Sequence, residues 1–192
     1  LTVTECDSTN ECDWRGGKCS AVCTDCVAGK FSVPGSDHCD DCEAGKYQNN
    51  SAQSTCITCP VGKYSDTGGA TECTDCSAGK YLTTEGGTSV EECTPCSVGM
   101  YHDGTTPGQS DSSICKSCPS GKYQPDTGAL SCIPCEAGKW SSLQSSICTS
   151  CVAGKYSAAG ATSCSACVAG KYDADQDPST ECTDCPDGEF ND

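Results

Sequence analysis

Apolar side chains are sparse in this chain and recur at one position of a short repeat. Ten times an aromatic residue stands two positions after a glycine, and the residue between them is lysine in eight cases. In an extended segment the lysine and the aromatic ring face opposite sides, because successive strand residues alternate. We expect each ring to be the main apolar content of its repeat, packed on a disulfide and the adjacent unit. The aromatic residues are Phe31, Tyr47, Tyr64, Tyr81, Tyr101, Tyr123, Trp140, Tyr156, Tyr172 and Phe190.

The segments that follow the aromatic residues predict small β-hairpins. Sequences such as YSDTGGATEC and YSAAGATSC place a glycine-containing or polar turn between two short extended runs. Segments 82–92 and 102–114 are longer versions, and helix signals are nearly absent. Units of this length are too short to fold alone, so we expect stacked two-stranded hairpins in an elongated, solenoid-like rod.

Composition explains how such a chain holds together. Leu, Ile, Val and Phe make up only about 10% of its 192 residues, too few for an ordinary core, whereas cysteines number 23. The sequence therefore predicts a small disulfide-rich repeat protein, which implies an extracellular or cell-surface location. No apolar run is long enough to span a bilayer, and we expect secreted or ectodomain material without direct membrane insertion in this segment. The net charge of −16 disfavours nucleic acid and anionic membranes as partners.

The cysteines divide the chain into a short leading region and a repeat array. We assign residues 1–22 to an N-terminal cysteine-rich cap or the end of a preceding module. Residues 23–192 form a tandem array of ten CxxC repeats of about 16–22 residues, of which the last is incomplete.

Two disulfide schemes fit the cysteine spacing, and sequence alone does not choose between them. Neighbouring CxxC pairs can lock in twos, Cys23 and Cys26 with Cys39 and Cys42. In a ladder, which we favour because it closes every hairpin, Cys6–Cys19 and Cys12–Cys23 precede the array and Cys185 is left unpaired or turned outward. The ladder bridges of the array are Cys26–Cys39, Cys42–Cys56, Cys59–Cys73, Cys76–Cys93, Cys96–Cys115, Cys118–Cys132, Cys135–Cys148, Cys151–Cys164 and Cys167–Cys182.

The repeated lysine position has two interpretations. It can be a solvated face that pairs weakly with nearby Asp and Glu, or a stripe through which the chain assembles with copies of itself or contacts glycans. The lysines are Lys30, Lys46, Lys63, Lys80, Lys122, Lys139, Lys155 and Lys171.

Other signals are weaker. Paired CxxC motifs also fit zinc sites, but the secreted composition favours bridges, and we expect no cofactor. Asp173, Asp175 and Asp177 make a weak candidate for a surface calcium site without the features of an EF-hand.

Asn49 begins a glycosylation sequon, Asn49-Asn50-Ser51. Only His38 and His102 are available as imidazole bases and neither lies in a repeated context, so we expect no catalysis.

The pattern C-x-x-C-x-[AV]-G-K-[YF] resembles the ephrin-receptor-like cysteine-rich repeats, which are similar to growth-factor-receptor cysteine-rich modules. The resemblance covers residues 23–190. Those repeats commonly read C-P-A-G-T-Y, so the lysine and the residue after the second cysteine depart from their pattern. The resemblance implies a rod-like extracellular segment without catalysis.

Two functions follow from these expectations. The first is a structural subunit of an extracellular fibre, appendage or matrix, which assembles with itself or similar subunits into a filament. The alternative is the ectodomain of a cell-surface receptor or adhesin that binds a protein or glycan ligand. A fibre would spread its contacts along the repeats, whereas a receptor would carry a deviant patch for its ligand.

Overall fold

The computed structural model describes residues 26–34, 36, 38–104 and 106–186. The chain divides into two compact units, one made of Leu1–Thr94 with Thr106–Asp111 and the other of Pro95–Thr105 with Ser112–Asp192. The cap predicted at residues 1–22 lies outside the described residues.

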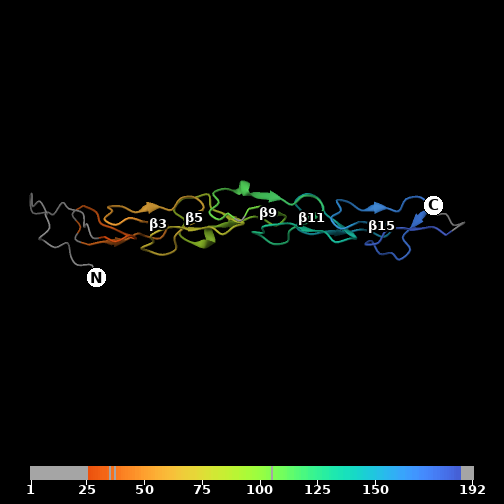
Figure 1. Cartoon of the computed structure of the whole chain (residues 1–192), viewed down its shortest axis with the longest axis horizontal. Helices are drawn as coiled ribbons and strands as arrows, with labels where there is room; N and C mark the ends of the chain where they lie inside the picture. The colour runs from red at the N-terminus through yellow and green to blue at the C-terminus, as the bar shows by residue number, and fades with distance from the viewer. Residues whose placement is uncertain (1–25, 35, 37, 105, 187–192) are drawn as a thin grey trace, which may run out of the picture. The chain divides into compact units, whose positions relative to one another are not determined.

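The described chain is a series of very short antiparallel hairpins joined by loops (Figure 1). Nine two-stranded sheets each pair two strands that follow one another in the chain, as the sequence predicts. They are β1 (Lys30–Phe31) with β2 (Asp40–Asp41), β3 (Lys46–Tyr47) with β4 (Ile57–Thr58), β5 (Lys63–Tyr64) with β6 (Thr74–Asp75), β7 (Lys80–Tyr81) with β8 (Thr94–Pro95), β9 (Met100–His102) with β10 (Cys115–Ser117), β11 (Lys122–Tyr123) with β12 (Ile133–Pro134), β13 (Lys139–Trp140) with β14 (Thr149–Ser150), β15 (Lys155–Tyr156) with β16 (Ser165–Ala166), and β17 (Lys171–Tyr172) with β18 (Thr183–Asp184). The prediction of a small disulfide-rich repeat protein of two-stranded hairpins is confirmed.

Two short 3-10 helices interrupt this pattern. η1 (Val90–Glu92) and η2 (Ser112–Ile114) each lie at the end of one of the two longest loops, immediately before the cysteine that closes the hairpin. Ser89 caps η1 by accepting a hydrogen bond from the Glu91 amide, 3.2 Å away. Neither helix, the only two in the described ranges, has the length and apolar character needed to cross a membrane.

A turn that needs glycine starts the hairpins. In the first, the Lys30 amide donates to the Val27 carbonyl oxygen, 3.1 Å away, and Gly29 has a φ of +88°. A positive φ at the third position of such a four-residue turn is the signature of a type II turn, which favours glycine there. A Cβ on Gly29 would also lie within 3.0 Å of the Gly69 carbonyl oxygen. The glycine therefore serves both the turn and a close backbone approach.

Successive hairpins are joined by backbone hydrogen bonds. The Gly29 amide donates to the Gln48 carbonyl oxygen, 2.7 Å away, and the Ala52 amide to the Cys26 carbonyl oxygen, 2.8 Å away. In the second unit the Gly121 amide donates to the Ser141 carbonyl oxygen in the same way, at 2.9 Å. Since these bonds use main-chain groups, they tolerate the wide variation of the loop side chains.

Disulfides form the buried centre of each unit. Apart from Leu82, every buried hydrophobic residue in the described part of the chain is a cysteine. The other buried positions with polar side chains directly follow the aromatic residues: Ser32, Gln48, Ser65, His102, Gln124, Ser141 and Ser157.

The expectation that the aromatic ring is the buried core of its repeat is therefore only partly right. The rings of the described repeats are half-buried, and in eight of these nine repeats the next residue is the buried one, the exception being Asp173 after Tyr172. Tyr64 shows the predicted contact, because it packs against Leu82 and the Cys76–Cys93 bridge of the next hairpin.

Candidate functional site

The disulfides set the frame on which all surface groups are displayed. Their Cα–Cα distances lie between 5.4 and 5.8 Å, within the usual range for a bridge. The nine bridges join the cysteine pairs of the ladder scheme: Cys26–Cys39, Cys42–Cys56, Cys59–Cys73, Cys76–Cys93, Cys96–Cys115, Cys118–Cys132, Cys135–Cys148, Cys151–Cys164 and Cys167–Cys182. Cys185 is a half-buried free thiol. Cys6, Cys12, Cys19 and Cys23 lie outside the described residues.

Most lysines of the repeated position are held by carboxylates of their own hairpin. Lys30, Lys63 and Lys171 reach across the two strands to Asp41, Asp75 and Asp184 at 2.8, 2.8 and 3.0 Å. Lys46 and Lys139 pair instead with the glutamates three residues before them, Glu43 and Glu136, at 3.4 and 3.2 Å. Lys80, Lys122 and Lys155 make no ion pair with another described residue. For five of the eight lysines the structure therefore agrees with the first interpretation, a solvated face whose lysines pair with nearby Asp and Glu.

The repeat that carries Met100 in place of lysine has an ion pair of another kind. Lys116 on β10 reaches Asp103, which follows β9. Their hydrogen bond lowers the pKa of Asp103 and raises the pKa of Lys116. The repeat pattern does not predict this pair, because neither residue occupies a position that recurs along the chain.

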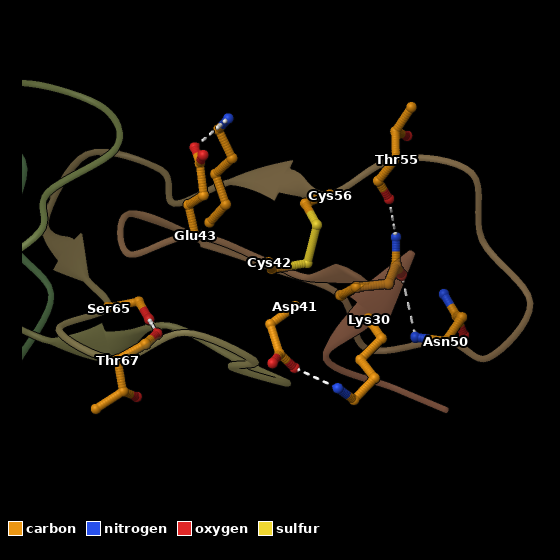
Figure 2. The surroundings of a disulfide bond; sticks show 11 residues. Lys30, Asp41, Cys42, Glu43, Asn50, Thr55, Cys56, Ser65 and Thr67 are labelled. Carbon is orange, nitrogen blue, oxygen red and sulfur yellow. Dashed lines mark hydrogen bonds and ion pairs between the residues drawn. A yellow bond between two sulfur atoms is a disulfide. The ribbon is translucent and has the colours of Figure 1, made fainter. Parts of the chain in front are cut away.

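A groove of about 610 Å³ lies between the first two described hairpins. Its walls include the Phe31 ring, the Asp40 and Glu43 carboxylates, the Lys46 ammonium group and the Thr55 side chain. Phe31 and Asp40 stand directly opposite each other in the β1–β2 register, so their side chains share one face of the hairpin. Asp41 also lines the groove, but its carboxylate is occupied by Lys30. Figure 2 shows this pair and Glu43 around the Cys42–Cys56 bridge.

A buried glutamine shapes the loop on one side of this groove. The Gln48 Nε2 group donates to the Thr55 carbonyl oxygen, 2.7 Å away, and Gln48 Oε1 accepts from the Asn50 amide, 3.1 Å away. Figure 2 shows these bonds at the labelled Thr55 and Asn50. Gln124 repeats the arrangement in the second unit, where it bonds the Ser131 carbonyl oxygen and the Asp126 amide.

An equivalent groove of about 320 Å³ lies in the second unit, between the hairpins closed by Cys118–Cys132 and Cys135–Cys148. Tyr123 takes the place of Phe31, and the Glu136–Lys139 pair takes the place of Glu43–Lys46. These two grooves coincide with the two repeats that read CEAGK in the described residues. Their main difference is opposite the ring, where Ile133 stands in place of Asp40.

The predicted glycosylation residue lies beside the first groove. Asn49 is exposed, and it follows the buried Gln48 in the loop that ends at Thr55. Its Oδ1 atom accepts a hydrogen bond from the Asn50 side chain, 2.9 Å away. The sequon is therefore accessible on the surface of the hairpin.

The acidic loop predicted as a weak calcium candidate is organised by its own hydrogen bonds. Asp175 accepts from the Thr180 hydroxyl at 3.1 Å, and Asp177 accepts from the Ser179 amide and hydroxyl at 2.9 and 2.7 Å. The hydrogen bonds from Ser179 lower the pKa of Asp177. Asp173 points elsewhere, because its carboxylate accepts from the Gly154 amide at 3.3 Å. Within the described ranges no three His, Cys, Asp or Glu side chains are grouped so that they could hold a metal ion.

The two histidines occupy unlike surroundings. His38 is exposed and lies 3.2 Å from the Ser36 hydroxyl and 3.4 Å from Asp40, which superficially resembles a Ser-His-Asp array. The Ser36 hydroxyl, however, donates to the His38 carbonyl oxygen and accepts from the His38 amide, as in a simple hydroxyl-stabilised turn. His102 is buried, and its Nδ1 atom has no hydrogen-bond partner.

Comparison with known families gives one result. Residues 29–76, 50–93, 104–146 and 154–192 match the family model described as tyrosine-protein kinase ephrin type A/B receptor-like. Together these segments cover most of the chain. A search of curated proteins found no match.

Proposed function

The chain belongs to the ephrin type A/B receptor-like family of cysteine-rich repeats, and on this basis we propose that it is a binding segment of a cell-surface receptor or adhesin. Cysteine-rich repeats of this family are extracellular, in agreement with the nine bridges and with the predicted extracellular or cell-surface location. The family is not typically catalytic. The family match supports a receptor or adhesin, the second of the two functions expected from the sequence, better than a fibre subunit.

The observation that carries this proposal is that the recurring lysine position is already largely engaged. A fibre subunit needs one contact that recurs on each repeat, and the lysine position was the candidate for that contact. Five of those eight lysines are already engaged within their own hairpins. The two CEAGK grooves, by contrast, are concave surfaces, and ligand sites are commonly concave.

Immuno-electron microscopy of the native material tests the proposal. An antibody against the folded chain should label the outer face of intact, unpermeabilised cells at scattered positions, and the labelling should disappear after brief surface proteolysis. Labelling that follows regular filaments would instead support the fibre subunit. Labelling only after permeabilisation would exclude both functions.

A further inference from the structure

We infer that the first groove, between the hairpins closed by Cys26–Cys39 and Cys42–Cys56, binds an arginine side chain of a basic protein ligand. This inference rests on the proposed function and names the chemistry of the ligand. It follows from one aromatic residue and two carboxylate residues, Phe31, Asp40 and Glu43, that line the same groove of about 610 Å³.

The ring and the first carboxylate are adjacent. Phe31 is half-buried, so part of its ring faces the groove, and Asp40 stands opposite it in the β1–β2 register. A guanidinium group is attracted to the face of an aromatic ring and forms strong, charge-assisted hydrogen bonds with carboxylates. Phe31 and Asp40 offer both interactions at one place, which suits the planar arginine side chain better than lysine.

Both carboxylates are open to a ligand. The side chain of Asp40 is 51% exposed and that of Glu43 is 83% exposed. Lys46 lies 3.4 Å from Glu43, and His38 lies 3.4 Å from Asp40. A single exposed ion pair of this kind contributes little, so a guanidinium group can displace it at low cost.

Charge complementarity selects the partner. The groove is lined by the acidic residues Asp40, Asp41 and Glu43 and by Lys46, and with the Lys30 that pairs with Asp41 this leaves one net negative charge. The whole chain has a net charge of −16, which attracts a basic partner and repels an acidic one. A neutral saccharide would gain nothing from this field.

The second groove is an internal control. It keeps the aromatic ring as Tyr123 and the ion pair as Glu136–Lys139, but Ile133 replaces the carboxylate opposite the ring. The exposed Ile147 further lowers its polarity. A ligand that required only the ring and the Glu–Lys pair would bind both grooves, whereas an arginine ligand prefers the first.

The experiment is an NMR titration of the full, oxidised, 15N-labelled chain at pH 7.5 and low salt. The probe is the peptide acetyl-Gly-Arg-Arg-Gly-amide, and its matched control has citrulline, the uncharged isostere, at both arginine positions. We expect saturating shifts at the amides of Phe31, Asp40 and Glu43 with the arginine peptide and at least tenfold weaker binding of the citrulline peptide. Raising the salt concentration to 0.5 M should weaken the arginine titration severalfold.

Variants separate the two grooves. Asp40→Asn and Glu43→Gln, each at an exposed site, should each weaken binding about fivefold or more with an otherwise unchanged spectrum, whereas Glu136→Gln should leave it unchanged. Equal binding of the citrulline peptide, equal effects of Glu43→Gln and Glu136→Gln, or shifts only with a saccharide such as chitotriose would overturn the inference. These outcomes are independent of the labelling experiment, because a chain found on filaments can still bind arginine, and a surface receptor can lack this site.

Discussion

The Gln48 side chain ties together the two ends of its loop through its hydrogen bond to the Thr55 carbonyl oxygen, at 2.7 Å. Gln48 is only 3% exposed, and its Oε1 atom accepts a second hydrogen bond from the Asn50 amide. One buried polar side chain thus takes the role that an apolar core residue has in larger domains. It also holds the loop that carries Thr55 against the first groove.

Replacement of Gln48 by alanine should destabilise this hairpin. The Thr55 carbonyl and the Asn50 amide would lose their partners, which costs about 1–3 kcal/mol. Hydrogen exchange should show faster opening of residues 48–55 than in the unchanged chain. Gln53→Ala is the matched control, because the Gln53 side chain bonds only the nearby Ser51 carbonyl oxygen from a more exposed position, and its effect should stay below about 0.5 kcal/mol. Equal protection of the loop in both variants would contradict the role of Gln48.

Replacement of Gly29 by alanine should be far more costly than the same change at Gly154. Both glycines have a positive φ, +88° and +75°, so both variants carry backbone strain of about 1–2 kcal/mol. A Cβ at position 29 would also press on the Gly69 carbonyl, whereas nothing lies within 4 Å of one at position 154. We therefore expect Gly29→Ala to lose roughly 3 kcal/mol or more.

Urea unfolding of the two glycine variants, followed by hydrogen exchange at the hairpins concerned, measures this difference. The decisive quantity is the difference in the free energy of unfolding between the two variants, since backbone strain is common to both. Similar losses of stability would mean that the approach of Gly69 to Gly29 is not a tight contact.

Reductant should unfold the chain and chelator should not. Each bridge closes a loop of 13 to 19 residues and contributes roughly 3 kcal/mol by restricting the unfolded chain. Circular dichroism and hydrogen exchange should therefore change on addition of dithiothreitol and remain the same with EDTA. Loss of structure with EDTA alone would show that a metal ion, and not the bridges, holds the fold.

The Asp103–Lys116 pair should depend on pH in a defined direction. The pKa of Asp103 is lowered in the folded chain, so its stabilising contribution is present above its unfolded pKa and is lost as pH falls through the folded value, in the acidic range below about pH 4. The pKa of Lys116 is raised, so its contribution is lost only as pH rises above about 10.5. The pair is thus complete throughout the neutral range.

An NMR titration of the Asp103 carboxyl carbon in the unchanged chain and in Lys116→Gln tests this assignment. The midpoint of Asp103 should move up towards the ordinary aspartate value when the ammonium group is removed. An identical midpoint in the two proteins would assign the lowered pKa to another cause.

Part of the candidate site followed from local pattern. The turn at Gly29 depends on residue type alone, because few residues other than glycine adopt the positive φ found there. The glutamate of CEAGK stands three residues before its lysine, and the Glu43–Lys46 and Glu136–Lys139 pairs form from this spacing alone. The grooves themselves could not be predicted, because each needs the side chains of two hairpins whose relative position is set by backbone bonds between them.

The sequence by itself determined the hairpin repeat, the reliance on disulfides and the family, because these depend on spacings and residue types that recur along the chain. Only the tertiary structure decided which cysteines pair, since both schemes close loops of reasonable length and the choice depends on which Cα atoms come within bridging distance. It also decided that the residue after the ring, such as Gln48 or Ser141, is buried in place of the ring in eight of the nine described repeats. This residue is buried because neighbouring hairpins contact each other there. The alternation of side chains along a two-residue strand does not predict that contact.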